Sequence, residues 1–550
     1  YDSLPAGLQT PQTQINRAMA LTREAAALDA SGAADAASAK FDAAQAVFEK
    51  LRAAGHNGED TTYGLALILN TKAANAFLSG IGQGKISDAV RAADLLRPLA
   101  RAPDASRRVR QLYANALSFA AFTQPLDQQL TTFDEARKVL EGLGALDLTD
   151  LNAASLYADT ADTEARTLLQ LGQIDKAQKL EQQAYDLTLK ILARQPGNLH
   201  AMANRVYTTG LLGTLASRRH DDAAAMAFAR KSAEAGEDEV RFNAADLNAW
   251  TRWAQGLAQV ARMQYDQGEI AESIASWRKL MALEQDPRRP SSLAPNLFYG
   301  WGALAQRQAL TGDSTGAAQS LEAEARDLVE VGARLPKGSV LHALSATRQQ
   351  GDTADVQLAE GNAQSAFKNA SAAVAELDAL KIPADDLNAG ASKNSSLATS
   401  LPIAASAAMR LGRYADAERF ARRWQQLPPP SQSRADPGVQ DSGARAMQAH
   451  ALIMQGHAAD ARKLLQPALE WYRAQAQAGA TATNFRRNYA YALYVSAISQ
   501  RADAAGTKQR KADLDAADKQ IAGASAQARQ LSNMRHVSGL IAAARTASPR

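Results

Sequence analysis

Three glycines alternate along residues 78–90, LSGIGQGKISDAV, and a lysine follows the last of them. Glycine-rich loops of this kind can cradle phosphate, but a P-loop needs glycine at position 79 and Ser or Thr at 86, where the hydroxyl binds magnesium. The chain has Ser79 and Ile86 instead. A dinucleotide fingerprint also fails, because Lys85 follows Gly82 at its third glycine position and no β-branched strand precedes the loop. The stretch therefore indicates no phosphate site.

The sequence also contains no recognisable motif for a metal site or a catalytic nucleophile. The chain has no cysteine, which excludes disulfides, thiol nucleophiles and cysteine-based zinc sites. Its seven histidines are scattered, and none has the His-x-x-x-His spacing of a helical zinc site. Nucleophile motifs of the Gly-x-Ser-x-Gly or Ser-x-x-Lys type are not evident in a credible context. The sequence thus predicts a non-enzymatic chain without a metal or a cofactor.

The charge balance argues against a nucleic-acid partner. The formal net charge of +4 comes from 61 basic and 57 acidic residues, and residues 501–550 alone contain nine basic and four acidic side chains. The rest of the chain has no basic surplus, whereas a phosphate-binding surface needs one. Apolar runs such as Leu65–Leu69 are far shorter than the roughly 20 residues that span a bilayer.

Alanine makes up roughly a fifth of the 550 residues. Because alanine has the highest helix propensity and lets helices approach closely, this bias predicts an all-α protein of tightly packed helices. The chain starts at Tyr1 without an initiating methionine or signal sequence, so we expect a processed protein or a segment of a longer one.

A repeating frame explains the opening glycines. A turn residue is followed by an apolar or small residue at +2 and a small residue at +5. It recurs at Gly32, Gly84, Gly172, Gly268, Gly312, Gly361, Gly412 and Gly456, with degenerate copies at Thr131 and Arg219. A glycine that ends one helix and an alanine on the buried face of the next form the turn of a helical hairpin. Gly84 is therefore predicted to be an inter-helix turn.

The frame resembles the tetratricopeptide repeat, most closely at residues 298–331, with Trp301 and Ala305 at the family's tryptophan and small positions, and at Gly412–Ala417. The period departs from the family, since it averages about 47 residues instead of 34. The resemblance implies an all-α, right-handed solenoid of about ten or eleven long hairpins, the eleventh from Asn484 to about Leu531.

Two stretches of the sequence interrupt the repeating frame. Residues 382–401 and 428–443 are rich in Pro, Ser, Asn, Asp and Gly and are predicted to be loops, either functional or simple spacers. We therefore expect a hairpin array over 1–381, a loop over 382–401, and further hairpins with a basic capping helix over 402–550, continuous with the first array.

A hairpin solenoid offers a concave surface made by the first helix of each hairpin. The resemblance places groove positions, and hence candidate ligand-binding residues, at Asp162, Arg166, Gln255, Arg262, Tyr265, Tyr299, Gln306 and His450. Trp250 and Trp253 join them, because aromatic and arginine side chains concentrate between about residues 246 and 310, as in binding hot spots. The competing interpretation is that these aromatics form core, which we favour for Trp277 and Trp301.

The leading functional interpretation is a module that binds a protein or an extended peptide segment. Residues 1–21 and 471–499 also resemble the repeat region that follows the transmembrane helix in some proteobacterial membrane-anchored serine/threonine kinases. That resemblance implies an extracytoplasmic sensor domain, with which the absence of cysteine agrees. A free periplasmic or cytosolic scaffold and an enzyme of unrecognised type remain the alternatives.

Overall fold

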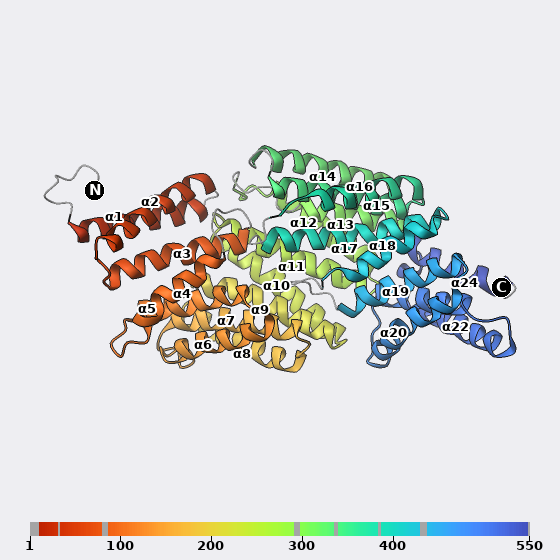
Figure 1. The fold of residues 1–550 in the computed structure, drawn as a ribbon, viewed down its shortest axis with the longest axis horizontal. Coiled ribbons are helices and arrows are strands. Elements are labelled where there is room, and N and C mark those ends of the chain that lie inside the picture. Colours follow the sequence, from red (N-terminus) through yellow and green to blue (C-terminus); the bar gives the residue numbers. More distant parts are fainter. Residues whose placement is uncertain are drawn as a thin grey trace. The chain divides into compact units, whose positions relative to one another are not determined.

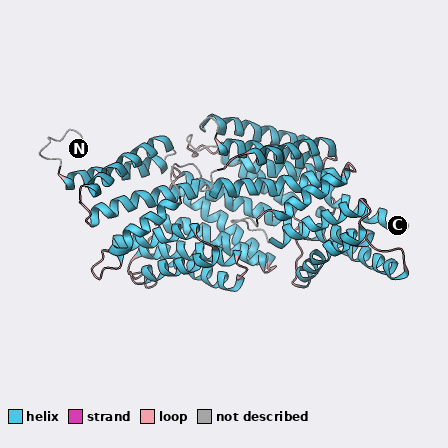
Figure 2. Cartoon of the chain, viewed as in Figure 1, coloured by secondary structure: helices cyan, strands magenta, loops and turns pink. Residues whose placement is uncertain are grey.

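The computed structural model describes residues 10–30, 33–79, 86–290, 298–334, 339–382, 387–428 and 437–547. These residues form helices joined by short turns, with no strand among them (Figure 2). None of the described helices combines the length and the apolar character needed to cross a bilayer.

The chain divides into two compact units. Unit 1 comprises residues 1–215, 230–256 and 287–293, and unit 2 comprises 216–229, 257–286 and 294–550. Three helices contribute residues to both units: α9 (Leu199–Arg218), which lies mostly in unit 1, α10 (Asp222–Phe242) and α11 (Leu247–Asp266). The remaining helices of unit 1 are α1 (Pro11–Ala30), α2 (Ala34–Ala53), α3 (Glu59–Ser79), α4 (Ser87–Ala100), α5 (Arg107–Ala120), α6 (Leu126–Glu141), α7 (Leu151–Gln170) and α8 (Ile174–Arg194).

Unit 2 continues the same pattern of helix pairs (Figure 1). Its helices are α12 (Ile270–Met281), α13 (Phe298–Thr311), α14 (Ser314–Arg334), α15 (Val340–Ala359), α16 (Ala363–Ala379), α17 (Leu387–Arg410), α18 (Tyr414–Gln426), α19 (Pro437–Met454), α20 (Ala458–Gln477), α21 (Thr483–Ile498), α22 (Ala504–Ala522), α23 (Ala526–Arg529) and α24 (Ser532–Thr546). The prediction of an all-α array of tetratricopeptide-like hairpins is confirmed, and the eleventh hairpin is α21 with α22.

The predicted turn glycines have the expected backbone. Gly172, Gly268, Gly312, Gly361, Gly412 and Gly456 all have φ between 71° and 90°. Glycine adopts this left-handed conformation without the steric cost that a Cβ imposes. Gly84 and Lys85 lie outside the described residues, between the end of α3 and the start of α4.

The small residues at +5 are the packing positions that the frame predicts. Nine of the ten are at most 1% exposed: Ala37, Ala89, Ala136, Ala177, Ser273, Ala317, Ala366, Ala417 and Ala461. The tenth prediction, Ala224, is off by one residue. His220 takes the glycine position with φ 59°, and Ala225, five residues later, is the buried alanine.

Two other sequence predictions are wrong. Thr131 is not a turn, because it lies inside α6, which begins after Pro125. Residues 387–401 are not a loop, because they form the first part of α17. Leu397, Leu401 and Ala404 are buried at helical spacing along α17, so packing overrides the loop-like composition. Of the second predicted loop, residues 437–443 are helical, and 429–436 lie outside the described residues.

Candidate functional site: an inner polar cluster in unit 2

The first helices of successive hairpins form a closed circuit within unit 2. Helix α13 packs on α15, α15 on α17, α17 on α19, and α19 on α21. The C-terminal helix α24 packs against both α21 and α13 and so completes the circuit. Side chains that point inward from these six helices therefore meet one another, although the chain separates them by up to about 240 residues.

Arg307 on α13 and Asp355 on α15 begin this inner group. The Arg307 guanidinium lies 3.6 Å from the centroid of the Tyr265 ring, and its Nε has no hydrogen-bond partner among the described residues. The Gln306 amide donates to Asp355. Burial raises the pKa of Asp355, while the Gln306 hydrogen bond and the positive charges of Arg307 and Arg487 oppose that rise. Asp355 is nevertheless only half-buried, so water still reaches it.

Helices α17, α19 and α24 add a second set of groups. Arg410 Nη1 donates to the Leu358 carbonyl at 2.7 Å, and burial lowers the pKa of Arg410 while Asp355 opposes that change. Burial and then Arg410 lower the pKa of His536. Burial and then His536 lower the pKa of His450 to about 4, so both imidazoles are neutral at pH 7.

Helix α21 closes the group with Arg487 and Tyr491. The Tyr491 hydroxyl is hydrogen-bonded to His450 Nδ1 at 2.8 Å, and the two rings meet edge to face. Arg487 is half-buried, and its guanidinium donates to Asn488 of its own helix. We call this set the inner polar cluster: Arg307, Asp355, Arg410, His450, Arg487, Tyr491 and His536.

The inner polar cluster supplies hydrogen-bond donors, acceptors and both signs of charge. It contains no cysteine, and none of the described residues forms a group of His, Asp and Glu suited to a metal ion. Three guanidinium groups face the Asp355 carboxylate, and Asp266, whose pKa burial raises to about 6, lies near Arg307. Chemically, such a surface recognises polar and charged groups.

Five of the predicted site residues belong to unit 1, and four of them, all but the exposed Gln255, are structural there. Asp162 and Arg166 form an ion pair at 2.8 Å on α7. Trp250 and Trp253 are only 2% and 4% exposed, so the prediction that they bind a ligand is not supported. The burial of Trp253 follows from close packing of α10 against α11. A Cβ at Gly236 on α10 would lie only 2.6 Å from the Trp253 Cα on α11, so the two backbones are in direct contact.

The other predicted residues divide between core, surface and the inner polar cluster. Tyr265 is 1% exposed and is core, which corrects its assignment as a surface hot spot. Arg262 is exposed and lies 6.0 Å from the Trp277 ring, and Gln255 is exposed as well. Gln306 and His450 do meet around the inner polar cluster. The backbone of Tyr299 lies in α13, and its side chain is outside the described set.

Sequence reasoning missed Arg307, Asp355, Arg410, Arg487, Tyr491 and His536. One signal was present for Asp355. The residue six positions before the turn glycine is polar in Arg166, Arg262, Gln306, Asp355, Ser406 and His450. In these six hairpins the position lies on the first helix, whereas Ala26 and Leu78 occupy it before Gly32 and Gly84.

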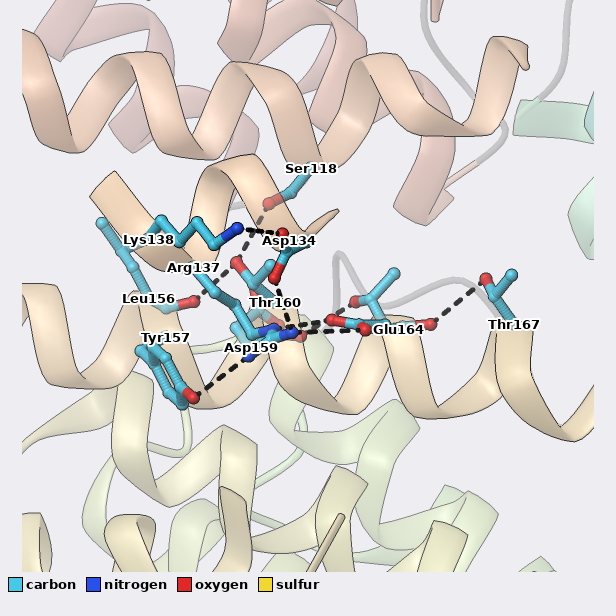
Figure 3. Close-up of polar contacts among 11 residues, drawn as sticks. Ser118, Asp134, Arg137, Lys138, Leu156, Tyr157, Asp159, Thr160, Glu164 and Thr167 are labelled. Carbon is cyan, nitrogen blue, oxygen red and sulfur yellow. Dashed lines mark hydrogen bonds and ion pairs between the residues drawn. The ribbon is translucent and has the colours of Figure 1, made fainter. Parts of the chain in front are cut away.

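A polar network in unit 1 provides a contrast. Arg137 Nε on α6 donates to Glu164 on α7 at 2.6 Å, and Nη1 lies 3.4 Å from the Tyr157 hydroxyl (Figure 3). Ser118 on α5 and Thr160 on α7 are hydrogen-bonded at 2.9 Å. These groups satisfy one another across neighbouring helices, as structural networks do.

Comparison with known proteins gives information on the helical architecture alone. No family model matches the sequence, and no curated protein matches it. Among solved structures, the chain is similar to a Rap protein complexed with competence and sporulation factor, with a TM-score of 0.42, 12% identity, and coverage of 75% of this chain and 98% of that one. It is also similar to aspartyl phosphate phosphatase F from Bacillus subtilis, with a TM-score of 0.43, 12% identity, and coverage of 79% of this chain and 97% of that one. Yeast Tom70 is a third similar structure, with a TM-score of 0.34, 12% identity, and coverage of 83% of this chain and 92% of that one. At this identity the likeness concerns helical architecture alone.

Proposed function

We propose that the chain is a non-enzymatic binding module and that the inner polar cluster of unit 2 binds a protein or peptide segment. The observation that supports this proposal is the convergence of charged and titratable side chains from six helices of the closed circuit. Of the seven residues, His450 is buried, Arg307, Asp355, Arg487 and Tyr491 are half-buried, and Arg410 and His536 are exposed, so the polar groups of a ligand can reach them. Polar and charged side chains gathered from several helices at one accessible place are a feature of binding sites.

The mixture of charges favours a peptide over a nucleic acid. A nucleic-acid site needs a surplus of basic groups to neutralise phosphates. Here Arg307, Arg410 and Arg487 are offset by the carboxylates Asp266 and Asp355. Guanidinium and carboxylate groups together can bind the carbonyls, amides and charged side chains of an extended segment.

Selection from a phage-displayed library of random decapeptides tests the proposal. We expect the wild-type chain to enrich peptides that lose about tenfold or more in affinity with Arg487→Gln or Asp355→Asn, as for central interface residues. Arg423→Gln is the matched control, because Arg423 forms an ion pair with Asp378 on exposed parts of α16 and α18. Enriched peptides that bind both cluster variants as tightly as wild type would contradict the proposal.

At a finer level, we propose that this module is the extracytoplasmic sensor region of a membrane-anchored signalling protein of the serine/threonine kinase type. The support is the resemblance of residues 1–21 and 471–499 to such regions and the absence of cysteine. The coding sequence upstream of Tyr1 tests it. A kinase domain followed by an apolar segment of about 20 residues supports the sensor, and a secretory signal peptide supports a free periplasmic scaffold instead.

A further inference from the structure

The last helices of unit 2 carry a surplus of positive charge. Residues 458–547, which include α20 to α24 and are drawn in blue in Figure 1, contain 13 basic and 6 acidic side chains. Residues 1–457 contain 47 basic and 51 acidic side chains. Of the 13 basic residues only Arg487 belongs to the inner polar cluster, so that cluster does not account for the surplus.

Two arginines bring the ends of these helices together. Arg462, near the start of α20, donates to the Ser499 carbonyl at the end of α21. Arg510, near the start of α22, donates to the Ala547 carbonyl at 3.0 Å, at the end of α24. Four further cations adjoin these contact residues in the sequence and therefore lie at the same end of the helices. We call them the terminal basic patch: Lys463, Arg501, Lys508 and Lys511.

The charges of the terminal basic patch are not neutralised by ion pairs. All four side chains are exposed, and none forms an ion pair with a described residue. Two acidic residues, Asp460 and Asp503, adjoin the patch in the sequence, so its four cations remain in excess. Asp503 accepts a hydrogen bond from the Gly506 amide at 2.7 Å and caps α22.

The arrangement of the patch does not serve helix stability. Lys508 and Lys511 are three residues apart on α22, and like charges at such spacing disfavour a helix slightly. The exposed arginines at α18 differ, because each of them forms an ion pair with Asp416 or Glu418: Arg413, Arg419 and Arg422. Unpaired cations are thus a local property of the C-terminal end of unit 2.

The chemistry of the patch favours a membrane surface over other polyanions. Three of its four cations are lysines, whose compact ammonium groups attract an anionic surface without the bidentate geometry of arginine. No described Phe, Tyr or Trp side chain of α20 to α24 is exposed, so none is available for stacking on bases. A long nucleic acid would also meet the net negative charge of residues 1–457.

We propose that the terminal basic patch binds the headgroups of anionic phospholipids. This interaction goes beyond the proposed function and does not depend on it, because none of the four residues belongs to the inner polar cluster. Binding is peripheral and electrostatic, since no described large hydrophobic side chain of α20 to α24 is exposed for insertion. Each basic residue close to such a surface strengthens binding by about fivefold.

Co-sedimentation of the full chain with lipid vesicles tests the proposal. At about 0.1 M salt we expect binding to phosphatidylcholine vesicles that contain about one third phosphatidylglycerol, and none to pure phosphatidylcholine. The triple variant Lys463→Gln, Lys508→Gln and Lys511→Gln should weaken this binding about 100-fold. Salt at about 1 M should abolish it, because the charges are then screened.

Three exposed lysines of α8 supply the matched control. The triple variant Lys176→Gln, Lys179→Gln and Lys190→Gln changes the net charge equally but lies in unit 1, and it should bind vesicles like wild type. Equal loss of binding in both triple variants, or no binding by wild type, would overturn the proposal. Tighter binding of a short DNA duplex than of the vesicles would also overturn it, in favour of a nucleic acid. Because the peptide selection above uses a different probe, its outcome is independent of this one.

Discussion

A protonated glutamate is the most distinctive single group next to the inner polar cluster. Glu324 on α14 is completely buried, and its carboxyl group lies beside that of Asp352. Burial and then the neighbouring Asp352 raise the pKa of Glu324 to about 9. Arg348 lies 3.6 Å from Asp352 and favours ionisation there, so Glu324 is the member of this carboxyl pair that carries the proton at pH 7.

This geometry predicts a loss of stability toward alkaline pH. Between the ordinary pKa of 4.5 and the folded value of about 9, the folded chain binds more protons at Glu324 than the unfolded chain. The contribution of Glu324 protonation to the free energy of unfolding is therefore fully present below pH 4.5. It is lost as the pH rises through about 9, and the free energy of unfolding falls by up to about 1.4 kcal/mol per pH unit.

Glu324→Gln should remove this slope, because the amide mimics the protonated acid. Urea unfolding at pH 6 and pH 9 measures it, and the variant should gain stability relative to wild type at the higher pH. The exposed neighbour Glu322 supplies the control Glu322→Gln. Parallel pH profiles of wild type and Glu324→Gln would show that Glu324 is ionised in the folded chain.

At the scale of the helix pair, the alanine at +5 fixes how closely two helices approach. Ala177 on α8 is completely buried and belongs to an apolar cluster with Ala165, Leu168, Leu211 and Leu215. Its neighbour Lys176 is exposed, and Lys176 Nζ donates to Gln173 at 2.9 Å. The two positions differ in environment by a single residue.

Ala177→Trp should lower the free energy of unfolding by about 1–3 kcal/mol or more, because an indole cannot enter a packed helix crossing without displacing it. Lys176→Trp, which adds the same side chain to the exposed face, should change stability by less than about 0.5 kcal/mol. Chemical denaturation of the two variants beside wild type is the measurement. An unchanged denaturation midpoint for Ala177→Trp would show that the small residue at +5 is not needed for helix packing.

These elements were largely predictable because their determinants are local. A glycine with positive φ, a short polar step and a buried alanine lie within six residues of one another, so the turns of Gly172 and Gly412 follow from sequence alone. The failures have tertiary causes. Helix α17 overrides its loop-like composition by burying Leu397 and Leu401, and His220 takes the left-handed turn position that glycine fills in the other copies, a conformation that histidine adopts more often than most residues but far less often than glycine.

The candidate site was less predictable for a related reason. Gln306 and His450 were identified by their position in the hairpin frame, but Arg410, Arg487 and His536 come together only because the circuit closes. Closure depends on the sum of small rotations between successive hairpins, and such sums are not visible in any local pattern. The concentration of aromatic residues between about 246 and 310 did not indicate a binding surface, since Trp250, Trp253 and Tyr265 are core residues.

At the scale of the molecule, each of the two units has its own apolar core. Leu140 is completely buried in a cluster confined to unit 1, and Leu465 is 1% exposed in a cluster confined to unit 2. Separate cores allow each unit to unfold as a cooperative transition of its own.

We therefore expect two transitions in urea. Leu140→Ala should shift one of them and Leu465→Ala the other, each by about 2–5 kcal/mol, because a buried leucine leaves a cavity when truncated. Circular dichroism with hydrogen exchange resolved along the chain assigns each transition to its unit. If both variants shift one common transition equally, the two cores unfold as a single cooperative system.

The closed circuit also constrains how this chain can change in evolution. Open repeat arrays lengthen or shorten by whole repeats, since each repeat contacts only its neighbours. Within unit 2, the Gln527 side chain caps α12 by accepting hydrogen bonds from the Ile270 and Ala271 amides. One duplicated hairpin would carry Gln527 away and would leave these amides without their cap. The number of hairpins in unit 2 is thus fixed by closure, and new binding specificities there must arise by substitution of the side chains that line the inner polar cluster.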